Sequence, residues 1–175
     1  MSQLIILRGN SGSGKSTTAL ALQARLGKNT LLISQDVIRR EIMYTSDGPD
    51  TLIIPMIIEM VRYGRTVCPY IIVEGIFKAP WYADMFETII KLCNQPPLIY
   101  YFDLPFQETL KRHQQRDKAN DFGEEAMRSW WNEHDQLGHA NEFLFNESHT
   151  PKEILAIIET ALNNSASTQK KRTDQ

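Results

Sequence analysis

Short apolar runs alternate with longer segments of helical periodicity along this chain. The runs show little polar alternation, which is typical of strands in a parallel sheet that is covered on both faces. The pattern therefore predicts an α/β domain with one sheet. Strands are expected at Gln3–Arg8, Thr30–Ser34, Tyr70–Val73, Leu98–Asp103 and Glu142–Asn146.

The segments between these runs carry helix signals. Gly27 follows the first helical segment in the usual C-terminal place, and Thr150-Pro151-Lys152-Glu153 is a capping sequence that opens the last one. Helices are expected at Lys15–Leu26, Asp36–Tyr44, about 52–65, Ala79–Cys93, the stretch carrying Thr109–Arg116, about 123–137, and from Pro151 to near Leu162.

The polar end of the chain differs from the rest. Asn163–Gln175 contains few apolar residues and the basic run Lys170-Lys171-Arg172. A segment of this composition is expected to fray or to be disordered. The predicted organisation is one domain over residues 1–163 and a polar tail over 164–175.

Composition and charge narrow the functional classes. The net charge of -2 among 175 residues gives no overall positive field for nucleic acid or an anionic membrane. Cys68 and Cys93 lack the spacing of a metal site. No apolar run approaches the roughly 18 residues of a membrane span, and no secretion signal precedes the first strand, so the cytoplasm is the expected compartment.

A phosphate-binding loop follows the first expected strand. The sequence matches G-x-x-x-x-G-K-[ST] at every fixed position, and a helix follows it. Backbone N–H groups of such a loop point at phosphate oxygens, the lysine reaches the β- and γ-phosphates, and the hydroxyl of Ser16 takes a Mg²⁺ position. ATP and Mg²⁺ are the expected cofactors. The nucleotide-binding residues are expected to be Gly9, Asn10, Ser11, Gly12, Ser13, Gly14, Lys15, Ser16 and Thr17.

Two classes of nucleotide-binding protein fit poorly. A GTPase would carry an Asn-Lys-x-Asp element after a later strand, and Asp117-Lys118-Ala119-Asn120 has a similar composition in the wrong order. A motor ATPase would need a longer chain. The small size favours a kinase that places a compact acceptor against the γ-phosphate.

The phosphate loop, the Ser34–Arg39 segment and the Arg112–Arg116 helix together resemble the small P-loop kinases. Polynucleotide 5′-kinase, chloramphenicol phosphotransferase, zeta-toxin-like kinases and uridine-kinase-like bacterial proteins share this plan. The resemblance covers about residues 3–162. It implies a three-layer P-loop fold with a five-stranded parallel sheet of the nucleotide-kinase type, and a mobile helical lid over about residues 105–137.

The resemblance also implies an acceptor site after the second strand. Asp36 matches the family's aspartate that orients and deprotonates the acceptor hydroxyl. A helix N-cap would also explain an Asp there, and the two roles are compatible. Arg39, one turn later, is expected to bind the acceptor; Arg40 is the competing choice. A solvated helix face would also explain either arginine.

Glu74 ends the third strand at the edge where α/β sheets bind ligands. Its position resembles that of the family's acidic residue that holds Mg²⁺ or a metal-bound water. A glutamate fits the tight octahedral geometry of Mg²⁺ less well than an aspartate, so acceptor binding and a structural ion pair stay open.

Two arginines, Arg112 and Arg116, lie four residues apart on one helix face. The resemblance implies that lid arginines close on the transferring phosphoryl group, with Arg116 preferred. A solvated basic face is the alternative. Trp130, Trp131 and Trp81 suit core packing better than stacking on an acceptor ring.

The sequence therefore predicts an ATP- and Mg²⁺-dependent kinase acting on a hydroxyl of a small-molecule or nucleoside-like acceptor. Lys15, Asp36, Arg112 and Arg116 are the expected catalytic residues, with Arg39 and Glu74 at the acceptor. A polynucleotide 5′-hydroxyl kinase and a non-catalytic nucleotide-binding module are the alternatives. The identity of the acceptor, the choice of triphosphate and the oligomeric state do not follow from the sequence.

Overall fold

The structure, a computed structural model, describes residues 2–115 and 123–173, with the backbone alone for 168–173. Its centre is one five-stranded parallel sheet in the order β2-β3-β1-β4-β5. The sheet confirms the predicted α/β class and each expected strand to within two residues. The strands are β1 (Gln3–Gly9), β2 (Thr30–Ser34), β3 (Tyr70–Gly75), β4 (Leu98–Phe102) and β5 (Glu142–Phe145).

The strand register brings distant residues to one edge of the sheet. Ser34 of β2 pairs with Glu74 of β3, and Gly9 of β1 pairs with Phe102 of β4. Because all strands are parallel, their carboxyl ends meet at this edge, where α/β proteins bind ligands.

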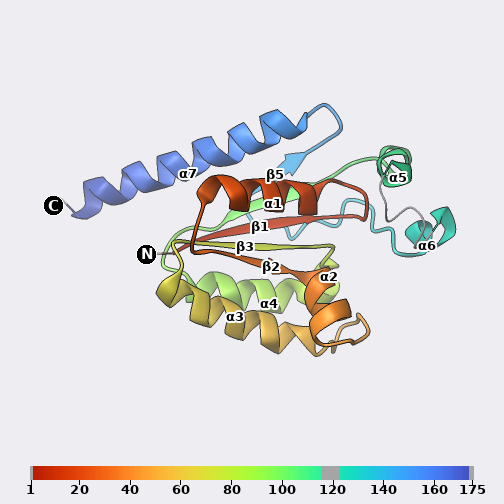
Figure 1. The fold of residues 1–175 in the computed structure, drawn as a ribbon, viewed down its shortest axis with the longest axis horizontal. Helices are drawn as coiled ribbons and strands as arrows, with labels where there is room; N and C mark the ends of the chain where they lie inside the picture. The colour runs from red at the N-terminus through yellow and green to blue at the C-terminus, as the bar shows by residue number, and fades with distance from the viewer. Residues whose placement is uncertain (1, 116–122, 174–175) are drawn as a thin grey trace.

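Helices cover both faces of the sheet, giving three layers (Figure 1). On one face α1 (Lys15–Leu26) and α7 (Pro151–Thr173) pack with each other over a core that includes Leu7, Leu22 and Ile158. On the other face α3 (Ile53–Val67) and α4 (Ala79–Leu92) pack over a second core. This burial explains the continuous apolar character of β1, whose residues are all buried.

Short elements stand at the ligand-binding edge. The segment after β2 forms α2 (Gln35–Val37) and a π-helical turn over Ile38–Ile42. After β4 come α5 (Phe106–Gln114) and α6 (Glu124–Ser129), which lie beyond the edge of the sheet in Figure 1. Within the segment expected to form a lid, the described residues 105–115 and 123–137 contain these two short helices.

Two expected helix ends are wrong. The helix predicted over about 123–137 stops at Ser129, because the backbone that follows donates to side chains of the phosphate loop and of β4 instead of continuing the helix. The last helix continues past Leu162 to Thr173, so the expected polar tail is helical there. No Gly or Pro interrupts that stretch, and Ser165 and Ser167 donate their hydroxyls to carbonyls one turn earlier.

Within the described residues, no helix combines the length and the hydrophobicity needed to cross a membrane.

Candidate nucleotide-binding and catalytic site

The phosphate loop connects β1 directly to α1. Gly9, Gly12 and Gly14 have φ of 149°, 81° and 101°, values that residues with a side chain rarely adopt. Gly14 is the N-cap of α1, so the positive end of the helix dipole faces the loop. The three glycines of the motif are therefore required by backbone conformation.

Gly12 is also the contact between the phosphate loop and α5. A Cβ atom built on Gly12 would lie 2.4 Å from the carbonyl oxygen of Thr109. Arg112, one turn after Thr109, donates from Nη1 to the carbonyl oxygen of Ser13 at 3.3 Å. The first lid helix thus packs on the loop that is expected to hold the phosphates.

Gly12→Ala is expected to lower the free energy of unfolding by about 1–3 kcal/mol and to weaken triphosphate binding, because the new methyl group meets backbone that must move. Denaturant unfolding and nucleotide titration measure the two effects. Gly27→Ala is the matched control: its φ is 82°, yet nothing lies within 4 Å of its added Cβ. Equal losses in the two variants would contradict a role for the contact with α5.

Lys15 and Ser16 lie at the start of α1. The ammonium of Lys15, which is 8% exposed, donates to the carbonyl oxygen of Asn10 at 3.2 Å, across the loop. The hydroxyl of Ser16 donates to Glu74 Oε2 at 2.9 Å. The motif's lysine thus lies across the phosphate loop, and its serine contacts the end of β3.

Glu74 connects β3 to both neighbouring segments. Its other carboxylate oxygen, Oε1, accepts from the hydroxyl of Ser34 at 2.5 Å, and the residue is 4% exposed. In the described part of the chain, no group of three or more His, Cys, Asp or Glu side chains is placed to hold a metal ion. A hydroxyl and one carboxylate nevertheless suit Mg²⁺, which keeps several waters and binds phosphate oxygens. Ser16 and Glu74 are thus the pair that fits this ion.

Asp36 is held by two arginines. Its Oδ1 accepts from Arg40 Nε at 2.6 Å and from Arg39 Nη2 at 3.1 Å. The helix α2 begins at Gln35, with Ser34 as its N-cap and no side-chain cap bond. The N-cap explanation of Asp36 is therefore wrong, because the residue lies inside the first turn.

Of the two expected lid arginines, Arg112 belongs to the described part of the chain and Arg116 does not. Arg112 Nε donates to Glu108 Oε1 at 2.6 Å, while its Nη1 reaches the phosphate loop. Arg116 lies outside the described residues. Thr17 is exposed in the first turn of α1 and does not line the cleft.

A cleft of about 610 Å³ opens at the carboxyl edge of the sheet. The phosphate loop supplies one wall, with Ser11, Gly12, Lys15 and Ser16. The opposite wall follows β2 and β3 and includes Asp36, Arg39, Glu74, Lys78 and Trp81. The remaining side is closed by residues 129–132, which include both adjacent tryptophans. The sequence favoured core packing for Trp81, Trp130 and Trp131. Trp81 does pack against the core, and all three also line the cleft.

Sequence reasoning missed a buried ionic network beneath the cleft. Arg8 on β1 is fully buried, and its Nη2 donates to Asp135 at 3.0 Å, while Nη1 lies 3.4 Å from Glu142. It also donates to the carbonyl oxygen of Phe77 after β3, at 2.6 Å from Nη2. Burial lowers the pKa of the Arg8 guanidinium, while Asp135 and then Glu142 oppose that shift.

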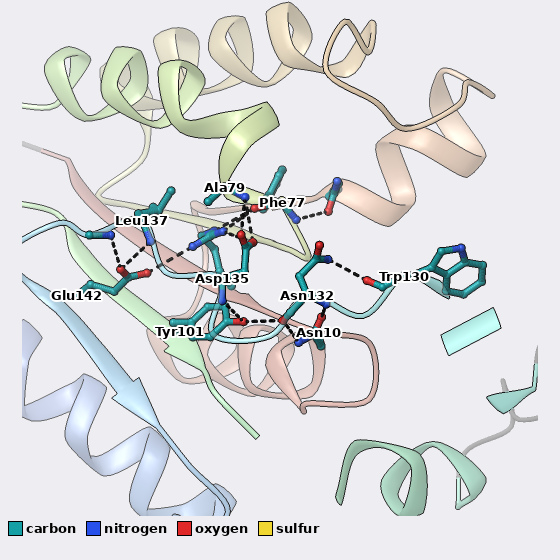
Figure 2. A network of polar contacts seen from close by, with 12 residues as sticks. Asn10, Phe77, Ala79, Tyr101, Trp130, Asn132, Asp135, Leu137 and Glu142 are labelled. Carbon is teal, nitrogen blue, oxygen red and sulfur yellow. Dashed lines mark hydrogen bonds and ion pairs between the residues drawn. The ribbon is translucent and has the colours of Figure 1, made fainter. Parts of the chain in front are cut away.

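This network fixes the chain that follows α6 (Figure 2). Burial raises the pKa of Tyr101 to about 12, so its hydroxyl stays protonated at neutral pH and accepts from the Asp135 backbone at 3.1 Å. Asp135 also accepts from the Ala79 backbone at 2.9 Å. The network therefore links β1, β4 and the start of α4 to the segment after α6.

Asn10 extends the same link into the phosphate loop. The side-chain nitrogen of Asn10 donates to the carbonyl oxygen of Asn132 at 2.7 Å, and its side-chain oxygen accepts from the Asn132 backbone N–H at 3.0 Å. Figure 2 shows this pair beside Asp135 and Tyr101. A variable position of the loop motif thus has a defined role, since it holds the wall of the cleft that carries Trp130 and Trp131.

A second polar cluster supports the opposite wall. Gln35 accepts from the Phe77 backbone at 3.1 Å and donates to the hydroxyl of Tyr82 at 3.0 Å. Tyr82 in turn donates to Asp47. Burial, followed by this hydrogen bond, raises the pKa of Tyr82, so the hydroxyl remains a donor. The cluster fixes the loop after β3 against the segment after β2.

Comparisons with known proteins agree with this architecture. The fold is similar to that of the protein APE1195, with a TM-score of 0.69, 15% identity, and 93% of this chain and 95% of that chain covered. A gluconokinase from Sinorhizobium meliloti 1021 gives a TM-score of 0.66 at 14% identity, with 97% of each chain covered. A search of curated proteins finds no significant relative.

A third solved structure is an APS kinase, CysC, from Mycobacterium tuberculosis in complex with AMPPNP and APS. It gives a TM-score of 0.64 at 14% identity, with 93% of this chain and 98% of that chain covered. A family model described as an AAA domain matches residues 4–137, which include the phosphate loop and every residue that lines the cleft. The chain therefore belongs to this AAA domain family, whose P-loop architecture is kinase-like.

Proposed function

We propose that the chain transfers the γ-phosphate of ATP, with Mg²⁺, to a hydroxyl group of a small-molecule or nucleoside-like acceptor. The observation that carries the proposal is the composition of the cleft. Its phosphate-loop wall carries a lysine and a serine, and its opposite wall carries an aspartate beside an arginine. Phosphoryl transfer is catalysed chiefly by such positioning and charge stabilisation.

The donor half of the reaction uses the phosphate loop. The loop's amides and Lys15 hold the β- and γ-phosphates, and Lys15 moves from the Asn10 carbonyl to the anion. Ser16 and Glu74 hold the Mg²⁺, which neutralises charge on the phosphates when bound. Arg112, already on the carbonyl of Ser13, and Arg116 approach the transferring group from the lid.

The acceptor half uses the wall after β2. Asp36 orients the acceptor hydroxyl and takes its proton, while Arg39 binds another part of the acceptor. The hydroxyl oxygen then forms a bond to phosphorus as the bond to the β-phosphate oxygen breaks, leaving ADP. A cleft of about 610 Å³ has the size of a small-ligand site. This size supports a small acceptor over a polynucleotide end.

Two structural neighbours are a gluconokinase and an APS kinase, which supports the reaction class. The proposed use of ATP and Mg²⁺ also supports a cytoplasmic location. A second function, nucleotide binding without chemistry, shares the phosphate loop but gives Asp36 no role.

Transfer of labelled γ-phosphate to a panel of nucleosides, sugars, hydroxy acids and DNA ends tests the proposal. The expected result is a labelled small acceptor formed only with Mg²⁺ present. Slow hydrolysis with no labelled product would favour the non-catalytic module, and labelling of DNA ends alone would favour the polynucleotide kinase.

A further inference from the structure

Lys78 occupies a fixed place on the acceptor wall of the cleft. It is the N-cap residue of α4, and its carbonyl oxygen accepts from the backbone of Trp81 at 2.9 Å and of Tyr82 at 3.2 Å. The backbone N–H of the next residue, Ala79, donates a hydrogen bond to the carboxylate of Asp135. Hydrogen bonds at Lys78 and Ala79 thus fix the backbone at this point, so the place on the cleft wall from which the Lys78 side chain extends is defined.

The ammonium of Lys78 lies over the ring of Trp81, 4.8 Å from its centroid. Both side chains line the cleft, and both residues are partly buried. Trp81 packs against the core cluster that contains Ile38, and it lines the cleft together with Asp36. The pair therefore belongs to the acceptor wall and lies on the sheet face opposite α1.

The carboxylates of the cleft are engaged by other groups. Asp36 pairs with Arg39 and Arg40, and Glu74 accepts from Ser16 and Ser34. Asp47 accepts from the hydroxyl of Tyr82 and from the amide of Gln35 at 3.3 Å. Within the described part of the chain, no carboxylate forms an ion pair with Lys78. The acceptor wall thus carries a positive charge that the surrounding protein does not neutralise.

We propose that Lys78 and Trp81 form an anion-reading subsite for the acceptor, which selects hydroxyl compounds that carry a carboxylate or a phosphate group. The inference rests on the proposed function and specifies the class of its acceptor. The ammonium pairs with the anionic group, while the ring of Trp81 packs against the carbon skeleton next to it. The reacting hydroxyl then lies toward Asp36, across the cleft from the phosphate loop.

The phosphate loop and the proposed subsite bind different anions: the loop binds the triphosphate, and Lys78 binds the anionic group of the acceptor. The triphosphate already has Lys15, the loop amides and the end of α1. Lys78 follows β3 and opens α4, and it lines the cleft together with Asp36 and Arg39. Removing its charge should therefore change acceptor selectivity and leave nucleotide affinity close to that of the unmodified protein.

The test compares neutral and anionic hydroxyl compounds of similar skeleton: glycerol with glycerate, glucose with gluconate, and ribose with ribose 5-phosphate. Binding is measured by calorimetry with AMPPNP and Mg²⁺ saturating, and transfer is measured as kcat/KM with ATP. At least one anionic member is expected to exceed its neutral partner by about tenfold or more in both assays. That advantage should shrink as ionic strength rises.

Three variants test whether the advantage of anionic acceptors depends on the ammonium group of Lys78. Lys78→Met is expected to remove the anionic advantage while neutral members and AMPPNP affinity stay unchanged, and Lys78→Arg to retain most of it. Lys91→Met is the matched control, because Lys91 lies on the same helix but is exposed and paired with Glu87. Equal behaviour of neutral and anionic members, or an advantage that survives in Lys78→Met, overturns the proposal.

The two assays also separate this inference from the proposed function. Anion binding that depends on Lys78, with no transfer to any acceptor, would support the subsite and contradict the kinase. Phosphoryl transfer that shows no preference for anionic members would support the kinase and contradict the subsite.

Discussion

Asp36→Asn is expected to lower the rate of phosphoryl transfer by about 10²–10⁴-fold, with ATP affinity close to that of the unmodified protein. The amide keeps the size of the carboxylate and still accepts a hydrogen bond, but it does not take the acceptor proton. Asp36 lines the cleft opposite the phosphate loop, so the change does not touch the residues that hold the triphosphate. Single-turnover transfer and nucleotide titration measure the two quantities.

The arginines beside Asp36 supply the control. Arg40 is the exposed member of the pair that contacts Asp36 Oδ1, and Arg40→Met removes its charge without changing the carboxylate. We expect Arg40→Met to retain most of the activity. If Asp36→Asn were as active as the unmodified protein, the assignment of the base would be wrong and the non-catalytic module would be favoured.

The second large effect concerns stability. Arg8→Met is expected to lower the free energy of unfolding by about 3–5 kcal/mol, because it leaves two carboxylates without their buried cation. Asp135 and Glu142 keep their backbone donors, Ala79 for the first and Leu137 with Gly138 for the second. These backbone hydrogen bonds do not neutralise the negative charges of the two carboxylates. Denaturant unfolding monitored by circular dichroism measures the loss.

A variant that also neutralises the partners separates charge from packing. Arg8→Met combined with Asp135→Asn and Glu142→Gln is expected to recover part of the lost stability, since no buried charge then lacks a counterion. The triple variant should still weaken nucleotide binding, because the segment fixed by Asp135 carries Asn132 and hence the contact to Asn10. A single variant as stable as the unmodified protein would contradict the structural role of Arg8.

Local patterns explain why the sheet and the phosphate loop could be predicted. Buried parallel strands appear in the sequence as apolar runs, and the loop motif lies within eight consecutive residues, so both signals are contiguous. The position of Glu74 followed from the same logic, because it ends a strand next to β1. Its two hydroxyl partners lie 58 and 40 residues away, and no local pattern reveals them.

The buried network had one signal in the sequence. Arg8 stands at the end of a continuous apolar strand, and a charge in such a place must find partners when it is buried. Its partners come from a segment more than 120 residues later, so they could not be named beforehand. The same distance hid the end of α6. The periodicity predicted a longer helix, but contacts of Asn132 with the phosphate loop and of Asp135 with β4 decide where the helix stops.

Binding of a triphosphate with Mg²⁺ is the most direct test of the whole account. Titration of the purified protein with a fluorescent ATP analogue is expected to show saturable binding that Lys15→Ala weakens roughly 10- to 100-fold. Lys28→Ala, an exposed lysine just beyond the end of α1, is expected to bind as the unmodified protein does. Failure to bind any triphosphate, or binding that is indifferent to Lys15→Ala, would contradict the account.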